Sequence, residues 1–241
     1  MKLLIAIDDT DNAEPGCVGT GRLARMLASE LCARDLAGSA TVTRHQLLVH
    51  PAIPFTSHNS AACIEADGAR VPLDELGRAA REFVLAHPNA GANPGLCVMA
   101  PEAVPSALLE FGKRAQSEVL ALESADDLAA RLDGMVWWCG ETGQGRIGAM
   151  AAVALRRSGE DGRFIGLPGI RGLEGVIPVR EIVARSGVER VETLEGEPLG
   201  DDDRVDTGGW VRPSLRGGRA VLRVRRDGDR WVPEEKWRKY R

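Results

Sequence analysis

The sequence predicts an α/β fold of mixed α+β character. Short apolar segments of strand type alternate along the chain with longer segments whose apolar residues recur at helical spacing. Two glycine-rich loops each join a strand pattern to a helix pattern, and this alternation is typical of helices packed on a sheet. The 241 residues, 44% of them hydrophobic, allow one large domain or two small ones with a substantial core.

The first expected strand ends abruptly in acidic residues. Residues 3–12 read LLIAIDDTDN, so that Asp8, Asp9 and Asp11 follow an apolar run. Asp is rarely buried without a partner, and strand ends are frequent ligand sites in open α/β sheets. Mg²⁺ takes one or two carboxylates together with substrate phosphates. We therefore expect a magnesium and nucleotide site here, the alternative being that these residues only close a turn or cap a local element.

A glycine-rich loop, AEPGCVGTG, comes next and leads into a helix expected over 22–36. Gly19 and Gly21 would let backbone N–H groups approach a phosphate at the start of this helix. The loop matches neither the Walker pattern nor the dinucleotide fingerprint. The loop alone therefore establishes no known nucleotide fold.

Strands are expected over 40–50 and 61–67, on either side of a polar loop bounded by prolines. His58 and Asn59 lie at the exposed tip of this loop and are candidates for substrate contact. The three histidines of this region, His45, His50 and His58, lack the spacing of metal ligands.

A helix is expected over 73–86 and a strand over 96–100, joined by the breaker segment NAGANPG. Asn93 in that segment either shapes an amine or nucleotide site or forms a plain turn. Helical patterns follow over 103–115 and 125–132, with a possible strand, EVLAL, between them, and MVWWC is expected to be another buried strand.

The second glycine loop begins the segment GETGQGRIGAMAAVALRR, residues 140–157. Gly143, Gly145 and Arg146 could hold phosphate oxygens through N–H groups and a guanidinium. The alternative is a glycine turn required by tight packing of a small-residue helix on a sheet.

The composition turns acidic and glycine-rich in GEPLGDDDRVDTGG, so we place a boundary near residue 200. Residues 1–200 would form a catalytic core, and residues 201–241 a basic C-terminal β extension. Within that extension, AVLRVRR and RWV form an expected hairpin that turns at Asp227-Gly228. Its arginines and tryptophans could meet RNA or could simply cover an exposed β-ribbon.

Overall composition excludes several classes. A net charge of −4 and few aromatic residues argue against a surface that coats nucleic acid. The five cysteines are widely separated, without a C-x-x-C pair, so a structural zinc site is not expected. No apolar stretch approaches the ~18 residues of a membrane span, and we expect a cytoplasmic protein.

Four segments together resemble the archaeal isoleucine-tRNA 2-agmatinylcytidine synthetase family, whose members use ATP to join agmatine to an anticodon cytidine. The segments are IAIDDTDNAEPGCVGTGRLA, VHPAIPFTSHNSAAC, ANPGLCVM and GQGRIGAMAAV, within residues 5–153. The resemblance implies a kinase-like ATP-binding domain with a ferredoxin-like part. It covers the N-terminal catalytic region only, without the OB and zinc-ribbon domains of the archaeal enzymes.

The resemblance also implies roles for individual residues. Asp8, Asp9 and Asp11 match the acidic motif that would hold magnesium, and Thr20 takes the place of a threonine that becomes phosphorylated. The second glycine loop matches the phosphate-side loop. One departure is clear: the family's Lys-Thr-Arg-Gly-Asn run becomes Thr56-Ser57-His58-Asn59 here, so its basic contacts are missing.

The leading hypothesis is an ATP- and magnesium-dependent ligase, which phosphorylates a substrate oxygen so that an agmatine-like amine displaces it. The substrate is expected to be a nucleotide or RNA, as in tRNA modification. The alternative is a non-catalytic module of the same fold that senses a nucleotide or an amine.

Overall fold

The computed structural model describes residues 1–12, 14–56 and 58–234. The chain divides into two compact units, Met1–Ser158 and Gly159–Arg241. Each unit is described by itself.

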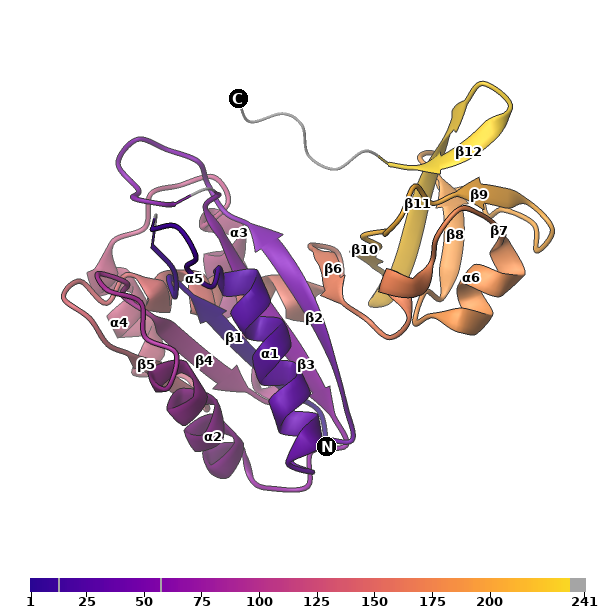
Figure 1. Ribbon diagram of the computed structural model, residues 1–241. Helices are drawn as coiled ribbons and strands as arrows, with labels where there is room; N and C mark the ends of the chain where they lie inside the picture. The colour runs from indigo at the N-terminus through magenta and orange to yellow at the C-terminus, as the bar shows by residue number, and fades with distance from the viewer. Residues whose placement is uncertain (13, 57, 235–241) are drawn as a thin grey trace. The chain divides into compact units, whose positions relative to one another are not determined.

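The first unit is a five-stranded sheet covered by helices on both faces (Figure 1). Its elements, in chain order, are β1 (Leu3–Asp8), α1 (Thr20–Ala33), β2 (Ser39–Gln46), β3 (Ser60–Asp67), α2 (Leu73–Leu85), β4 (Gly95–Met99), η1 (Pro101–Ala103), α3 (Ser106–Arg114), α4 (Leu122–Ala129), β5 (Met135–Trp138) and α5 (Gly145–Ser158). The strand order is β5-β4-β1-β3-β2, and each neighbouring pair is antiparallel. The predicted mixed class is therefore correct. Because the strands are antiparallel, however, the acidic residues do not lie at an edge formed by the carboxyl ends of parallel strands, as in an open α/β sheet.

Strand β1 lies between β3 and β4 and is apolar on both sides because both of its faces are covered. Leu4 and Ala6 pack in one cluster with α5 and α3. Successive residues of a strand point to opposite faces, so Leu3, Ile5 and Ile7 face the side covered by α1 and α2. This alternation places Asp8 on the α5 face, in line with Leu4 and Ala6.

Helix α5 packs closely against the sheet because its residues are small. The run from Ala149 to Ala154 is buried, and a Cβ at Gly112 of α3 would overlap with Ala154. The expected strand EVLAL is wrong: residues 118–121 form an irregular connection in which Val119 is 48% exposed, and α4 begins at Leu122. Leu120 still packs against the core, which explains why the segment is apolar.

The second unit is built mainly of short strands. Its elements are β6 (Arg163–Gly166), η2 (Ile170–Gly172), β7 (Val176–Pro178), α6 (Val179–Arg185), β8 (Arg190–Thr193), β9 (Arg204–Asp206), β10 (Ser214–Arg216), β11 (Arg219–Asp227) and β12 (Arg230–Pro233). Strand β11 pairs with β10 and β12 in antiparallel fashion and with β8 in parallel fashion. The expected hairpin is present as β11 and β12, with Asp227 opposite Arg230 and Gly228 at a φ of 62° in the turn.

The expected boundary near residue 200 falls inside this second unit. One apolar cluster joins residues before that point, such as Ile182 and Val191, to residues after it, such as Val205 and Leu222. The acidic segment at 201–203 is an exposed loop, in which Asp202 pairs with Arg180 of α6. The change in composition therefore marks a solvated loop, and the structural division lies at Ser158/Gly159.

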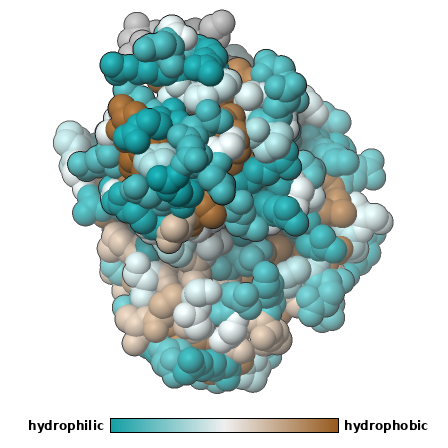
Figure 2. All heavy atoms as spheres, turned by 90° about the vertical axis from the view of Figure 1, so that its right-hand side faces the viewer, coloured by the Kyte–Doolittle hydropathy of each residue, from teal (hydrophilic) through white to brown (hydrophobic). Residues whose placement is uncertain are grey.

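The described residues include no helix that is both long enough and apolar enough to cross a membrane. Figure 2 shows one face of the molecule, on which hydrophilic side chains predominate and apolar ones form small separate groups.

Candidate functional site

The acidic loop, residues Asp8 to Asn12, begins at the end of β1 that lies beside the start of β4. Asp8 is opposite Gly95 in the sheet, and its side chain lies against Gly148 of α5, where an added Cβ would overlap with the carboxylate. Gly148 therefore gives the Asp8 carboxylate its space beneath the helix.

The environment of Asp8 is unfavourable to its charge. Burial raises the pKa of Asp8 to about 7, and the nearby charge of Asp9, with a further contribution from Asp11, acts in the same direction. A hydrogen bond from the backbone N–H of Asp9 opposes the shift only in part. Asp8 is therefore a carboxyl that gains or loses its proton near neutral pH, a property that is frequent at functional sites.

Asp9 has a left-handed backbone, with a φ of 51°, which turns the chain sharply after the strand. Burial raises its pKa, as does the charge of Asp11, while a hydrogen bond from the backbone N–H of Asn93 lowers it. Asn93 thus lies directly beside the acidic loop.

Asp11 lies on the other side of the loop from Asp8. Its Oδ1 accepts a hydrogen bond from the Thr56 hydroxyl at 3.4 Å, and its Oδ2 lies beside Gly19, which immediately precedes α1. The three carboxylates thus spread from the α5 face to the start of α1. Within the described part of the chain, no three His, Cys, Asp or Glu side chains are grouped so as to hold a metal ion.

The second glycine loop meets the acidic loop through Asn93 and Gly95. The N–H of Thr142 donates to Asn93 Oδ1 at 2.8 Å, and the N–H of Gly145 donates to the Asn93 carbonyl at 3.2 Å. A Cβ at Gly145 would overlap with the backbone of Asn93 and Gly95, and it would lie 2.9 Å from the Asp8 carbonyl oxygen. The two loops are therefore in close contact, and glycine is required where their backbones meet.

Arg146 is held by the protein itself. Its Nε and Nη2 donate to the two carboxylate oxygens of Asp126 at 2.7 and 2.9 Å, and its Nη1 donates to the Gly143 carbonyl at 2.7 Å. The guanidinium also stacks on Trp138, and the side chain is 7% exposed. This arrangement fixes the glycine loop and leaves the guanidinium engaged within the protein.

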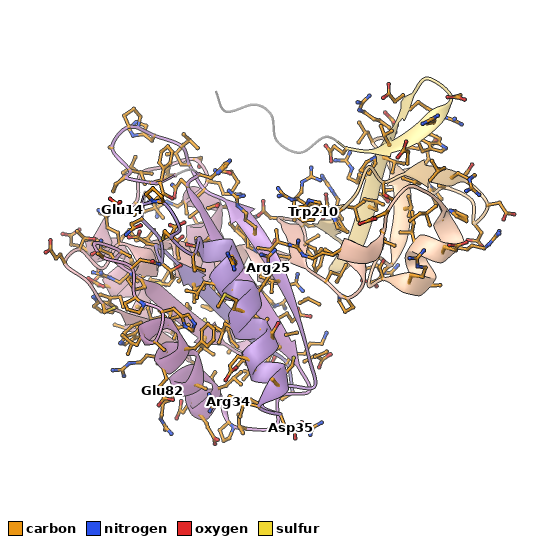
Figure 3. The ribbon with its side chains drawn as sticks, in the orientation of Figure 1. Glu14, Arg25, Arg34, Asp35, Glu82 and Trp210 are labelled. Carbon is orange, nitrogen blue, oxygen red and sulfur yellow. The ribbon has the colours of Figure 1, made fainter. Side chains whose placement is uncertain are left out.

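Thr20 begins α1, and its side chain is buried. Its hydroxyl lies 3.0 Å from that of Thr10 and accepts a weaker bond from the Thr10 N–H at 3.4 Å. Gly19 and Gly21 flank Thr20, and Asn89 fixes the same region by donating to the Thr10 carbonyl. The first glycine loop therefore packs against the acidic loop. Figure 3 shows Glu14 in the first glycine loop, whereas Arg34 and Asp35 mark the far end of α1.

His58 and Asn59 lie at the end of the proline-bounded loop. His58 is exposed, whereas Asn59 is half-buried and donates its side-chain amide to the Leu48 carbonyl. The histidines of this region are separate: His45 is buried against Thr43, and His50 accepts a bond from the N–H of Ala52. Ser57 lies outside the described residues.

Sequence reasoning did not single out Arg44, Asp126 or Gly148, and it showed Thr56 only as part of the run that replaces the family's basic segment. Arg44 looks like an ordinary polar residue of an alternating strand, and Asp126 lies in an acidic helical segment that gives no sign of a partner 20 residues later. Gly148 had a usable signal, because a glycine inside a helix often marks a close contact.

No family model matches the chain. The chain is 31% identical over 156 residues to the isoleucine-tRNA 2-agmatinylcytidine synthetase TiaS of Pyrobaculum neutrophilum, and the match covers 64% of this chain and 35% of that enzyme. Among solved structures, apo TiaS, described as an isoleucine-tRNA agmatidine synthetase, is similar with a TM-score of 0.54 at 25% identity, over 64% of this chain and 35% of that one. A region of this chain is related to TiaS.

The complex of TiaS with isoleucine tRNA and ATP is similar with a TM-score of 0.54 at 26% identity, over 64% of this chain and 36% of that one. The complex with isoleucine tRNA, AMPCPP and agmatine has a TM-score of 0.52 at 26% identity, with the same coverage. This chain thus has a mixed α/β fold with a large, mostly antiparallel sheet that is structurally similar to TiaS. The chain spans about a third of the length of these relatives.

Proposed function

We propose that the first unit binds ATP and uses it to activate a substrate oxygen for displacement by an amine, in the manner of an agmatinylcytidine synthetase. The protein would then be a C–N bond-forming ligase that acts on RNA or on a smaller nucleotide. The amine would be an agmatine-like cation, for which the carboxylates of the acidic loop are a suitable partner.

The observation that carries this proposal is the meeting of the acidic loop with the second glycine loop. Phosphoryl transfer depends mainly on positioning and on the neutralisation of phosphate charge. Carboxylates next to backbone N–H groups of glycine loops are the parts that this chemistry needs. The similarity of the fold to TiaS structures that contain ATP or AMPCPP also supports the proposal.

Magnesium would be held by one or two of the carboxylates, together with phosphate oxygens and water. The charge of Asp9 acts on Asp8 and that of Asp11 acts on Asp9, and such closely placed carboxylates suit a cation site, although Asp11 lies toward α1. The cation would supply neutralisation of the phosphate charge. In its absence, burial and then repulsion among the carboxylates raise the pKa of Asp8 and of Asp9.

The residues of the two glycine loops have different proposed roles. Gly19, Gly21 and Gly143 would place backbone N–H groups near the phosphates. Gly145, whose N–H donates to the Asn93 carbonyl, would instead join the two loops, and Arg146 would hold its loop in shape through Asp126. Asn93 would position Asp9, and His58 with Asn59 would face the substrate. The order β-α-β-β-α-β of the elements from β1 to β4 is that of a split βαβ motif, which we infer is the ferredoxin-like part.

A second function is favoured by Thr20. A hydroxyl that is buried and bonded to Thr10 cannot take a phosphate unless this contact opens. A nucleotide- or amine-binding module without turnover would retain this contact.

Calorimetry with ATP and Mg²⁺ tests the shared first step, using the wild type, Asp8→Asn and, as a matched control, Asp133→Asn. Asp133 is exposed before β5, whose start lies opposite Val98, away from Gly95. We expect the wild type and the control to bind ATP and Asp8→Asn to bind more weakly. Absence of binding by the wild type would overturn both functions.

Labelled γ-phosphate ATP then separates the enzyme from the binding module. Label on Thr20, absent from Thr20→Val, or ATP turnover stimulated by agmatine supports the enzyme. Tight ATP binding without either result supports the binding module.

A further inference from the structure

Arg44 lies at the edge of the candidate site, although nothing in the sequence singled it out. In the sheet, Arg44 of β2 is opposite Ala62 of β3, and Ala62 is opposite Ile7 of β1. These residues share the face covered by α1, the side of the loop on which Asp11 lies. The Nε of Arg44 donates to the Ser60 hydroxyl at 2.7 Å.

The charge of this guanidinium is only partly compensated. Burial lowers the pKa of Arg44 from its ordinary value, and the charge of Asp11 opposes the shift. The side chain is half-buried, and it forms no ion pair with a carboxylate of the described residues. Removing a charge from water is costly unless a partner of opposite charge replaces the water.

The other cations of the site are differently placed. Arg146 donates to both carboxylate oxygens of Asp126, and Arg22 is exposed on α1. The proline-bounded loop from Ile53 to Asn59 contains no lysine or arginine. Arg44 is therefore the half-buried guanidinium beside the acidic loop that, among the described residues, is not paired with a carboxylate.

We infer that Arg44 binds a phosphate group of the nucleotide on the Asp11 side of the acidic loop. A phosphate oxygen would complete the missing ion pair through charge-assisted N–H···O bonds, for which guanidinium geometry is well suited. This inference rests on the proposed function and adds the residue that recognises the triphosphate. The Ser60 hydroxyl would fix the guanidinium from the protein side.

The test is calorimetry with three probes, namely ATP with Mg²⁺, inorganic tripolyphosphate and adenosine. The variants are Arg44→Gln and Arg44→Lys, with Arg78→Gln on the exposed side of α2 as the control. We expect Arg44→Gln to weaken binding of ATP and tripolyphosphate about tenfold, and Arg44→Lys to lose less. Adenosine binding and the thermal midpoint should stay unchanged, because neither depends on a phosphate contact.

Several results would overturn the inference. Equal ATP affinity of the wild type and Arg44→Gln would remove Arg44 from the phosphate site and leave the proposed function intact. Equal losses for adenosine and tripolyphosphate would indicate that Arg44 only supports the fold, as would unfolding of both variants. If the wild type bound tripolyphosphate through Arg44 but did not bind ATP, the proposed function would fail and the phosphate site would remain.

Discussion

The acidic loop and the second glycine loop meet at one end of the first unit, but their interactions differ in kind. Around the glycine loop, Arg146 donates to Asp126 and to the Gly143 carbonyl, and Asn93 Oδ1 accepts a hydrogen bond from the N–H of Thr142. In the acidic loop, burial and neighbouring charges raise the pKa of Asp8 and of Asp9. The glycine loop is held by ion pairing and hydrogen bonds within the protein, whereas Asp8 and Asp9 form no ion pair among the described residues.

This difference indicates that the second glycine loop and the acidic loop have different roles. A closed network with tight backbone packing holds a fixed shape, and a set of uncompensated charges is suited to a ligand. We therefore assign the glycine loop chiefly to support and the acidic loop chiefly to binding.

The largest expected effect comes from breaking the support. Gly145→Ala would place a methyl group against the backbone of Asn93 and Gly95, which cannot move as a side chain can. We expect it to lower the free energy of unfolding by about 3 kcal/mol, measured by urea denaturation. Gly38→Ala is the control, because its Cβ would meet neighbouring backbone no closer than the Asp67 carbonyl at 3.5 Å. A loss no greater than that of the control would show that the loops are not tightly packed.

A smaller effect should separate the two arginines. Arg146→Lys loses the two-pronged contact with Asp126, and we expect unfolding free energy to fall by about 1–2 kcal/mol. Arg44→Lys should change it by less than about 0.5 kcal/mol, because Arg44 is not paired with a carboxylate of the described residues. Thermal or urea unfolding of both variants under one condition measures the difference. Equal losses of unfolding free energy in the two variants would contradict the assignment of Arg146 to structural support and of Arg44 to ligand binding.

Next in size is the pH dependence of Asp8→Asn. Because the pKa of Asp8 is about 7 in the folded protein and near 3.8 when unfolded, the unfolded chain loses this proton first, and wild-type stability falls as pH rises between these values. Asparagine does not ionise, so the variant should gain stability relative to the wild type as pH rises from about 4.5 to about 8. We expect a gain of a few degrees in thermal midpoint at the upper end of this range. A gain independent of pH would show that the Asp8 charge is not the cause.

Sequence patterns predicted much of this fold for physical reasons. The spacing of apolar residues along a segment reflects which of its faces is buried. This spacing correctly located β1, α1 and α2 in residues 3–8, 22–36 and 73–86. The failures at EVLAL and near residue 200 concern segments whose composition does not distinguish a strand or a linker from a packed connection or a surface loop.

The site was only partly accessible to the same reasoning. Both loops stand out in the sequence, because carboxylates and glycines at strand ends serve ligand binding or tight turns. Their contact depends on the antiparallel pairing of Asp8 with Gly95, which no local pattern specifies. Likewise, the Arg146 contact with Asp126 and the position of Arg44 beside Asp11 arise only from tertiary packing.

Mg²⁺ bound together with ATP is proposed to neutralise the carboxylates of the acidic loop. This proposal is tested most directly by the proton balance of binding, measured by calorimetry at a pH of about 6.5 with saturating Mg²⁺, in two buffers of different ionisation enthalpy. The raised pKa of Asp8 predicts that the wild type binds ATP with net release of protons, and that Asp8→Asn binds with less release. Binding of ATP by the wild type with the same proton balance as Asp8→Asn would contradict the account.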